Sequence, residues 1–204
     1  MSIEFLITAL IVVLAPGTGV VYTLATGLAQ GRMASVAAAF GCTLGIIPAI
    51  LASVFGLAAL FHTSALLFQT VKFAGVAYLL YLAWQTLKDR GTLRVSGEGA
   101  PRRSLFAIAR NGFLINILNP KLSVFFLAFL PQFITPGAGS ASRQMVEMGA
   151  AFMAITFAVF CIYGLSASAV GARVLRSARA MDWIRRTVAV AFAGFGLRLA
   201  LSER

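Results

Sequence analysis

The stretch LINILNPKLSVFFLAFL, residues 114–130, puts two asparagines, a proline and a lysine inside an otherwise apolar run of helix length. Because proline has no N–H and its ring crowds the preceding turn, Pro120 is expected to leave the carbonyl of Asn116 without its helical partner. Asn116, Asn119 and Ser123 follow a spacing of three and four, which places them on roughly one helical face. These residue types at this spacing could bind a small polar solute.

Two lysines also fall inside apolar runs. Lys121 directly follows the Asn-Pro pair, about ten residues from either end of its run, where an ionisable group costs roughly 2.5–3.5 kcal/mol and is a functional candidate. Lys72 lies closer to the end of its run, where its amine could reach the membrane surface, so it is a weaker candidate. The first run has its own interruption, LAPGTG, in which Pro16 and Gly17 are predicted to break the helix.

The composition defines the solvent around these residues. Of the 204 residues, 60% are hydrophobic and 11% are charged, which is typical of a membrane protein. Apolar runs of about the 20 residues needed to cross a bilayer recur along the chain. They predict six spans, at about 5–28, 36–60, 66–87, 105–134, 145–170 and 187–201. Residues 1–204 are therefore expected to form a single all-α transmembrane domain.

The 17 lysines and arginines predict how the chain lies in the membrane. Most of them flank the first, third and fifth loops, whereas Arg143, Arg198 and Arg204 fall on the opposite side. By the positive-inside rule, both termini are expected to be periplasmic in a bacterial inner membrane. This placement attributes the basic residues to topology and to contact with the lipid bilayer, and it argues against a nucleic-acid partner.

The Gly-, Ser- and Arg-rich loop at about 89–104 divides the chain into halves at about 1–88 and 105–204. Three spans in each half is an odd number, so the halves would cross the membrane in opposite directions. Gly45 and Gly149 keep the sequence offset of Pro16 and Pro120. Gly/Pro interruptions at matching places in inverted halves indicate a transporter's binding site near the midplane. The spaced glycines Gly27, Gly31, Gly41 and Gly45 indicate close helix packing.

Other classes of function remain as alternatives. A passive channel would need a continuous polar lining, whereas the polar residues here concentrate at the two breaks. An enzyme is not expected, because the spans contain no acid pair, no Ser/His or Cys/His arrangement and no cluster of metal ligands. Cys42 and Cys161 suggest neither a disulfide nor a zinc site. No nucleotide-binding motif or other cofactor motif is visible. The acid in MSIEFL indicates that the first run is kept as a helix and is not a cleaved signal.

The chain resembles the LysE/RhtB family of bacterial amino-acid exporters over nearly its whole length. The resemblance rests on four motifs in order, namely Pro16 with Gly17, the glycines Gly31, Gly41 and Gly45, Lys72 with Gly75, and Asn119, Pro120 and Lys121. Two positions depart from the family pattern: Thr18 stands where many members have a second proline, and Ile46 stands where many have an acid or polar residue.

The resemblance implies a secondary transporter of six helices, built as two inverted repeats with helices one and four broken. The expected substrate is an amino acid, with Lys121 as its carboxylate contact. No acid is available at the midplane to pair with a cationic side chain, so a neutral substrate resembling threonine, homoserine or leucine is favoured. Export of another small metabolite is the alternative. Coupling to protons or another ion and assembly into a homodimer are left open. The site is expected to contain Pro16, Gly17, Lys72, Asn116, Asn119, Pro120 and Lys121.

Overall fold

The computed structural model describes residues 2–14, 17–61, 103–135 and 137–167, with short pieces between 70 and 88 and between 182 and 197. At 57–61, 120, 121, 124 and 128 it describes the backbone alone. The described residues form helices and turns without a strand, which confirms the all-α prediction.

Two of the described helical stretches are long and apolar enough to cross a membrane, Arg32–Gly56 and Ala141–Ser166. The pair Ile3–Leu14 and Thr18–Gln30 makes a third span if the bent pair is counted as one. These stretches coincide with the first, second and fifth predicted spans. Most of the third and sixth predicted spans lies outside the described residues.

The first span is interrupted where the sequence predicts it. Helix α1 (Ile3–Leu14) ends at the first residue of LAPGTG, and α2 (Thr18–Gln30) begins after Gly17, whose backbone is extended. The two helices meet at 54°. At the other end of α2, Gly31 takes a positive φ of 88°, a conformation that glycine adopts without strain. Its N–H donates to the Gly27 carbonyl, so the chain turns directly into α3 (Arg32–Leu44).

The fourth span is also broken. Ser104 caps α6 (Leu105–Ile117) by accepting a hydrogen bond from the Ala107 N–H, and the helix ends at Leu118 and Asn119. Helix α7 (Pro120–Phe129) then begins on Pro120, because proline at a first helical position sacrifices no backbone hydrogen bond. As predicted, the Asn116 carbonyl has no i+4 helical partner, but it is not left without a hydrogen bond. It accepts a 3.1 Å hydrogen bond from the Asn119 N–H, so the last turn tightens to the 3₁₀ form.

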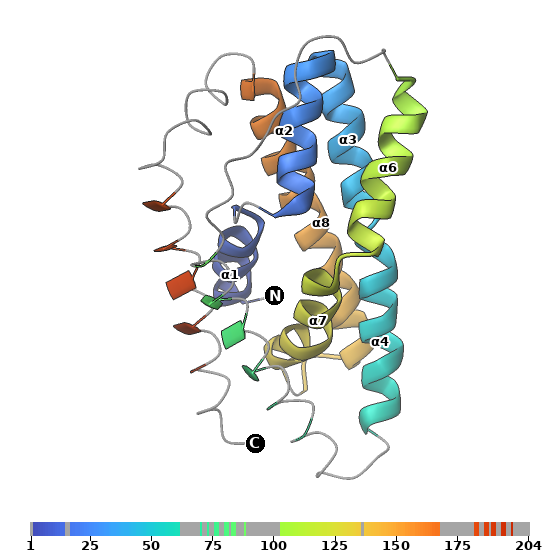
Figure 1. Cartoon of the computed structure of the whole chain (residues 1–204). Coiled ribbons are helices and arrows are strands. Elements are labelled where there is room, and N and C mark those ends of the chain that lie inside the picture. The colour runs from blue at the N-terminus through green and yellow to red at the C-terminus, as the bar shows by residue number, and fades with distance from the viewer. Residues whose placement is uncertain are drawn as a thin grey trace.

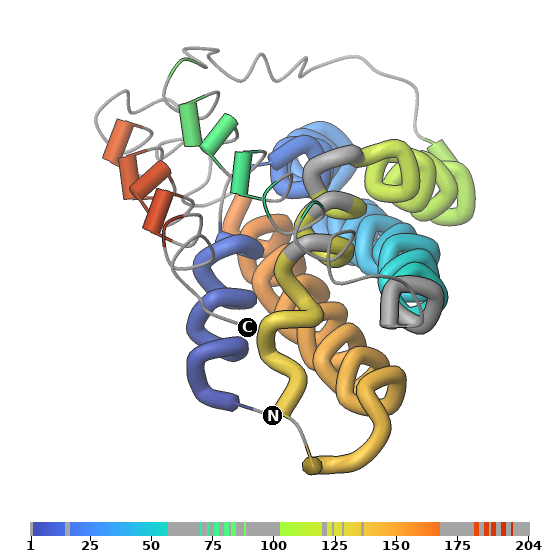
Figure 2. The backbone as a smooth tube through the Cα atoms, turned by 90° about the horizontal axis from the view of Figure 1, so that it is seen from below, coloured from blue at the N-terminus to red at the C-terminus, as the bar shows by residue number. Residues whose placement is uncertain are grey.

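A milder discontinuity separates α3 from α4 (Ile47–Phe61) at Gly45 and Ile46. In Figure 1 this junction and the two helix breaks lie at about the same height. Helix α8 (Ala141–Ser166) runs past all three without a break. Viewed from below in Figure 2, α8 lies between α1 and the α3–α4 pair, and it contacts α1, α2, α3 and α4.

Glycines allow α3 to approach the other helices at backbone distance. A methyl group on Gly41 would come within 1.9 Å of the Ala109 carbonyl oxygen on α6, and one on Gly45 would come within 2.6 Å of the Phe113 carbonyl oxygen. The predicted role of these two glycines in close packing is confirmed. Gly31 has no such neighbour and serves the turn instead.

Aromatic side chains fill the core beside α7. The buried rings of Phe125 and Phe126 pack against Phe152 of α8, with centroids 5.6 and 5.0 Å away, and the buried ring of Phe129 packs against Phe125 at 5.0 Å. The rings continue through Phe133 of the 3₁₀ helix η1 (Leu130–Phe133) to Phe5 of α1. Edge-to-face and offset ring contacts at these distances are favourable, so the cluster ties α1, α7 and α8 together.

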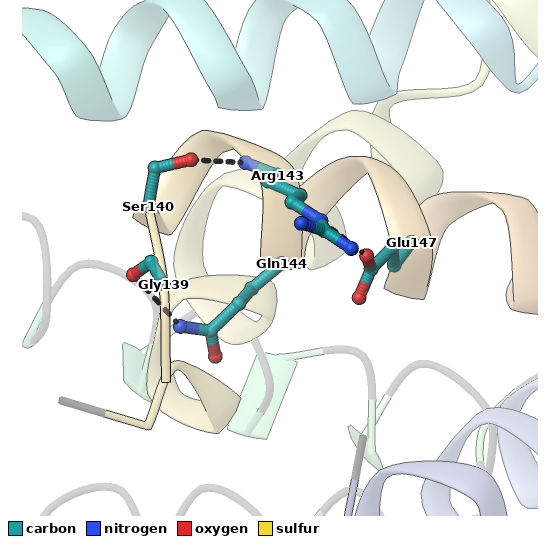
Figure 3. A network of polar contacts seen from close by, with 5 residues as sticks. All are labelled: Gly139, Ser140, Arg143, Gln144 and Glu147. Carbon is teal, nitrogen blue, oxygen red and sulfur yellow. Dashed lines mark hydrogen bonds and ion pairs between the residues drawn. The ribbon is translucent and has the colours of Figure 1, made fainter. Parts of the chain in front are cut away.

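Hydrogen bonds order the connection from η1 into α8 (Figure 3). Ser140 caps α8 by accepting from the Arg143 N–H, and the Gln144 amide donates to the Gly139 carbonyl. Arg143 forms an ion pair with Glu147 one turn later, with 2.8 Å between Nε and Oε1. The positive charge of Arg143 at this end of the molecule is therefore offset by an adjacent carboxylate.

Large apolar side chains also cover the outside of the described helices. Phe55 is 70% exposed, Phe106 is 78% exposed and Leu118 is 76% exposed. A protein in water seldom exposes so many large apolar side chains, but a hydrocarbon solvent surrounds such a surface without penalty. The exposed faces fit a location in the membrane.

Candidate substrate pocket

The two helix breaks open onto one pocket of about 60 Å³, room for a few water-sized groups. Gly17, Gly19 and Val20 line it from the first break, and Asn116, Asn119 and Leu122 line it from the second. Helices α1, α7 and α8 and the α3–α4 turn complete the wall, with Val12, Val13, Ile46, Phe125, Phe152, Thr156 and Phe160. The wall is mainly apolar, with polar groups at the breaks.

Asn116 is the most buried polar side chain contributed by the second break, with 5% of its surface exposed. Its Nδ2 donates a 2.7 Å hydrogen bond to the Cys42 carbonyl oxygen on α3. Its Oδ1 faces Gly19, since a methyl group on Gly19 would lie 3.2 Å from that oxygen. The amide therefore joins α6 to α3 and presents its oxygen towards α2.

Two helix N-termini converge on the pocket. The first turn of α2 contributes Gly17, Gly19 and Val20, and the first turn of α7 adjoins Asn119 and includes Leu122. The N–H groups of a first helical turn have no acceptor within the helix, and the helix dipole puts partial positive charge there. This arrangement can stabilise a carboxylate or another anion.

The carbonyl at the end of α1 has a partner from α8. Leu14 is the last residue of α1, so its carbonyl has no donor within that helix. The Tyr163 hydroxyl donates to it at 3.2 Å. A backbone acceptor exposed by the first break is thus satisfied by protein, as a low-dielectric environment requires.

The pocket has different surroundings towards the two ends of the molecule. Towards η1, the pocket-lining rings of Phe125 and Phe152 are followed by the buried ring of Phe129. Towards the α2–α3 turn, α2 and α8 approach each other at backbone distance, because a methyl group on Gly27 would lie 2.8 Å from the Gly164 carbonyl oxygen. Among the described residues that line the pocket, the polar side chains are those of Asn116, Asn119 and Thr156.

The structure brings three of the predicted site residues together, since Gly17, Asn116 and Asn119 all line the pocket. Pro120 and Lys121 begin α7, between Asn119 and Leu122, and only their backbone is described. Pro16 and Lys72 lie outside the described residues. Ser123, predicted on the same face as the asparagines, is half-buried but does not line this pocket.

Sequence reasoning missed the contribution of α8, where Phe152, Thr156 and Phe160 follow a spacing of four and face the pocket. The apolar run around them looks uniform, so periodicity alone does not mark them. It also missed Gly19, although this residue completes the GTG sequence at the first break. Ile46, noted only as a departure from the family pattern, is fully buried in the wall.

Comparison with known proteins shows similarity along the whole chain. The family described as "LysE type translocator" matches residues 10–203. An "Uncharacterized membrane protein" of Vibrio cholerae is 33% identical, covering 98% of this chain and 97% of its own length. A "Homoserine/homoserine lactone efflux protein" of Salmonella typhimurium is 31% identical over 82% of this chain and 81% of its own. A "Leucine efflux protein" of Klebsiella pneumoniae is 27% identical over 97% and 93%.

No solved structure matches the chain significantly. The family match nevertheless covers both helix breaks and α8, so it includes every described residue that lines the pocket. Together with the apolar helices, it makes this a membrane protein. The chain belongs to the LysE type translocator family.

Proposed function

We propose that this protein is a secondary transporter that exports neutral amino acids across a bacterial inner membrane. The observation that carries the proposal is the convergence of two helix breaks on one small pocket. Discontinuous helices whose N-terminal ends point at a substrate carboxylate are a recurring way of binding amino acids at the middle of a membrane. The efflux proteins among the relatives, for leucine and for homoserine, support this substrate class.

We assign Lys121 as the residue that binds the substrate carboxylate. Its backbone lies in the first turn of α7, between two residues that line the pocket, Asn119 and Leu122. The positive end of the helix and the lysine amine would then act on the same carboxylate. Gly17, Pro16, Asn116, Asn119 and Pro120 are assigned to the two breaks that form this part of the site, and Lys72 is retained as a second basic candidate.

A neutral side chain is favoured by the rest of the wall. Val12, Val20, Ile46 and the rings of α8 are apolar, and none of the described residues that line the pocket is acidic. A lysine or arginine side chain would need an anionic partner to offset its desolvation. A leucine-like, threonine-like or homoserine-like side chain does not.

Alternating access is the mechanism that we assign, with six spans arranged as two inverted repeats around the breaks. The polar groups of Asn116 and Asn119 at one break, in a pocket whose other described lining residues are mainly apolar, support a carrier over a pore. A carrier must expose its site to one side at a time, whereas a passive channel needs a continuous polar path. We leave the coupling ion, if the carrier uses one, unassigned.

Counterflow in proteoliposomes tests the proposal, because only a carrier exchanges external label for internal unlabelled substrate. Purified protein should exchange leucine, threonine or homoserine in preference to lysine. Lys121→Met should abolish exchange and Lys121→Arg should retain part of it. Lys88→Met is the matched control, since Lys88 lies over the Trp84 ring at 4.7 Å and not in the pocket.

Four results would contradict the proposal. Normal exchange by Lys121→Met would show that Lys121 does not bind the substrate carboxylate. Exchange restricted to lysine and arginine would remove the neutral substrate class. Entry of label that is independent of internal substrate would indicate a channel, and the absence of exchange with every amino acid would point to another small metabolite.

A further inference from the structure

We propose that Gly19 and Phe160 together set the largest substrate side chain that the pocket accepts. Both residues line the pocket, Gly19 from the first turn of α2 and Phe160 from α8. The inference rests on the proposed transport function and adds to it a pair of residues that selects among neutral amino acids by size.

The space beside Gly19 is already closely occupied. A methyl group at this position would lie 2.9 Å from Cε2 and 3.3 Å from Cζ of Phe160, and 3.2 Å from Oδ1 of Asn116. Carbon atoms prefer separations of about 3.5–4.0 Å. An alanine at position 19 is therefore accommodated only if the Phe160 ring, the Asn116 amide or α2 itself moves.

Two of these three groups are held in place. The Asn116 amide donates to the Cys42 carbonyl at 2.7 Å, so displacing it would break a buried hydrogen bond. Helix α2 is held by its neighbours, because a methyl group on Gly27 would lie 2.8 Å from the Gly164 carbonyl oxygen on α8, and the Cys42 thiol of α3 donates to the Gly19 carbonyl at 4.0 Å. The ring of Phe160 has only van der Waals contacts to lose and is the end of a rotatable side chain.

Among the described residues, the open space beside the displaced ring is the pocket that Phe160 lines. Phe160 is only 6% exposed, and protein interiors are packed too densely to accept a shifted ring elsewhere. A shifted ring would therefore move into the pocket and reduce its volume of about 60 Å³. Glycine at position 19 thus keeps the ring back, and the position of the ring decides how much of the pocket a substrate side chain can use.

The expected consequence is a change in selectivity and not a uniform loss of transport. One methylene group more or less in an apolar pocket typically changes discrimination about tenfold or more. Gly19→Ala should lower the ratio of leucine to alanine exchange by about tenfold. Phe160→Leu, which shortens the side chain, should raise the ratio of phenylalanine to leucine exchange.

The test compares counterflow of leucine, alanine and phenylalanine by the purified wild type, Gly19→Ala, Phe160→Leu and the double variant. Because the methyl group of Gly19→Ala meets Phe160, the double variant should recover a leucine to alanine ratio close to that of the wild type. Gly56→Ala is the matched control, since among the described side chains its methyl group would meet Leu127 Cδ2 alone, at an ordinary 3.5 Å, outside the pocket. Thermal unfolding in detergent monitors folding of each variant.

The outcomes separate this inference from the proposed function. If the wild type exchanges no amino acid, the proposed function fails and this inference fails with it. If the wild type exchanges amino acids but Gly19→Ala reduces leucine and alanine equally, or Phe160→Leu leaves every ratio unchanged, size selection by this pair is wrong and the transport function stands. Failure of the double variant to restore the ratio likewise overturns the pairing.

Discussion

Polar side chains in the described helices bond to backbone carbonyls in two different ways. The hydroxyls of Thr23, Thr43 and Thr156 donate to the carbonyl four residues earlier in their own helix. The side chains of Ser53, Asn116 and Tyr163 instead reach carbonyls on other helices. The first kind satisfies a polar group locally, whereas the second kind ties helices together where water cannot compete.

Tyr163→Phe tests such a tie at the first break. The change removes the hydroxyl that donates to the Leu14 carbonyl at the end of α1. We expect the free energy of unfolding to fall by about 1–3 kcal/mol, the usual range when a polar group in an apolar environment is left without its hydrogen bond. Thermal or denaturant unfolding of the purified protein in detergent measures it.

Tyr22→Phe is the matched control for this residue. The Tyr22 hydroxyl donates to the Ile108 carbonyl, which lies within α6 and keeps its helical environment when the hydroxyl is removed. Loss of the Tyr22 hydroxyl should lower the free energy of unfolding by only about 0.5–1.5 kcal/mol. Equal destabilisation by the two changes would mean that the carbonyl at the break has no special need of Tyr163.

The sequence predicts part of this residue-scale chemistry. Proline and asparagine inside an apolar run identify Asn116 and Asn119 as candidates, because each is unfavourable in a plain lipid-facing helix. The periodicity that places them on one face does not identify what faces them, so the Cys42 carbonyl as the partner of Asn116 was not predictable. Nor was the 3₁₀ turn that satisfies the Asn116 carbonyl, since proline chemistry alone predicts only the lost bond.

At the scale of the helices, glycine determines how closely α3 and α6 approach. We expect Gly41→Ala to prevent normal assembly, because the added methyl group would lie 1.9 Å from the Ala109 carbonyl oxygen and backbone on both helices would have to move. The accumulation of folded protein in membranes and its unfolding temperature in detergent measure the effect. Core overpacking commonly costs about 1–3 kcal/mol, and a clash with backbone lies at the upper end or beyond.

The same replacement in α4 provides the comparison for Gly41→Ala. Gly56→Ala introduces an identical methyl group in a helix where it meets only an ordinary side-chain contact. It should accumulate and unfold like the wild type, and it gains slightly in helix propensity. If Gly41→Ala matched Gly56→Ala in both measurements, the close approach of α3 and α6 would be wrong.

The helices and their breaks follow from sequence more directly than their neighbours do. Apolar length predicts the spans containing α2, α4 and α8, and proline with glycine predicts both breaks. The spaced glycines correctly indicate close packing at Gly27, Gly41 and Gly45. They fail at Gly31, where the reason for glycine is a positive φ in a turn, and spacing cannot separate that cause from packing. Which helix each glycine meets is a long-range property that no local pattern encodes.

At the scale of the whole molecule, the two ends of the described helices differ in charge. Arg32 follows the α2–α3 turn, and Arg103 precedes α6 at the same end, where its N–H donates to the Gln30 side chain at 2.8 Å. At the opposite end, Arg143 is paired with Glu147 (Figure 3). The described part of the chain thus has unpaired arginines at the end that the sequence predicts to be cytoplasmic. This asymmetry supports the predicted orientation without fixing the side of either terminus.

Reporter fusions test that orientation. Phosphatase activity requires export to the periplasm, whereas fluorescence of a cytoplasm-dependent reporter requires retention. A phosphatase fused after Arg204 should be active and the fluorescent reporter at the same point should be dark, because an even number of spans returns the chain to the side of its N-terminus. Fusions within the loop at about 89–104 should give the reverse pattern, since three spans precede it.

The lysines and arginines retained on the cytoplasmic side orient membrane proteins with short loops, so removing positive charge from a cytoplasmic loop should change the topology. Replacing Arg102 and Arg103 with glutamine should therefore raise the fraction of molecules whose loop is exported. Arg143→Gln should not, because it removes a positive charge from the side predicted to be periplasmic. Fluorescence after Arg204 in the wild type would contradict both the orientation and the even number of spans on which the inverted repeats depend.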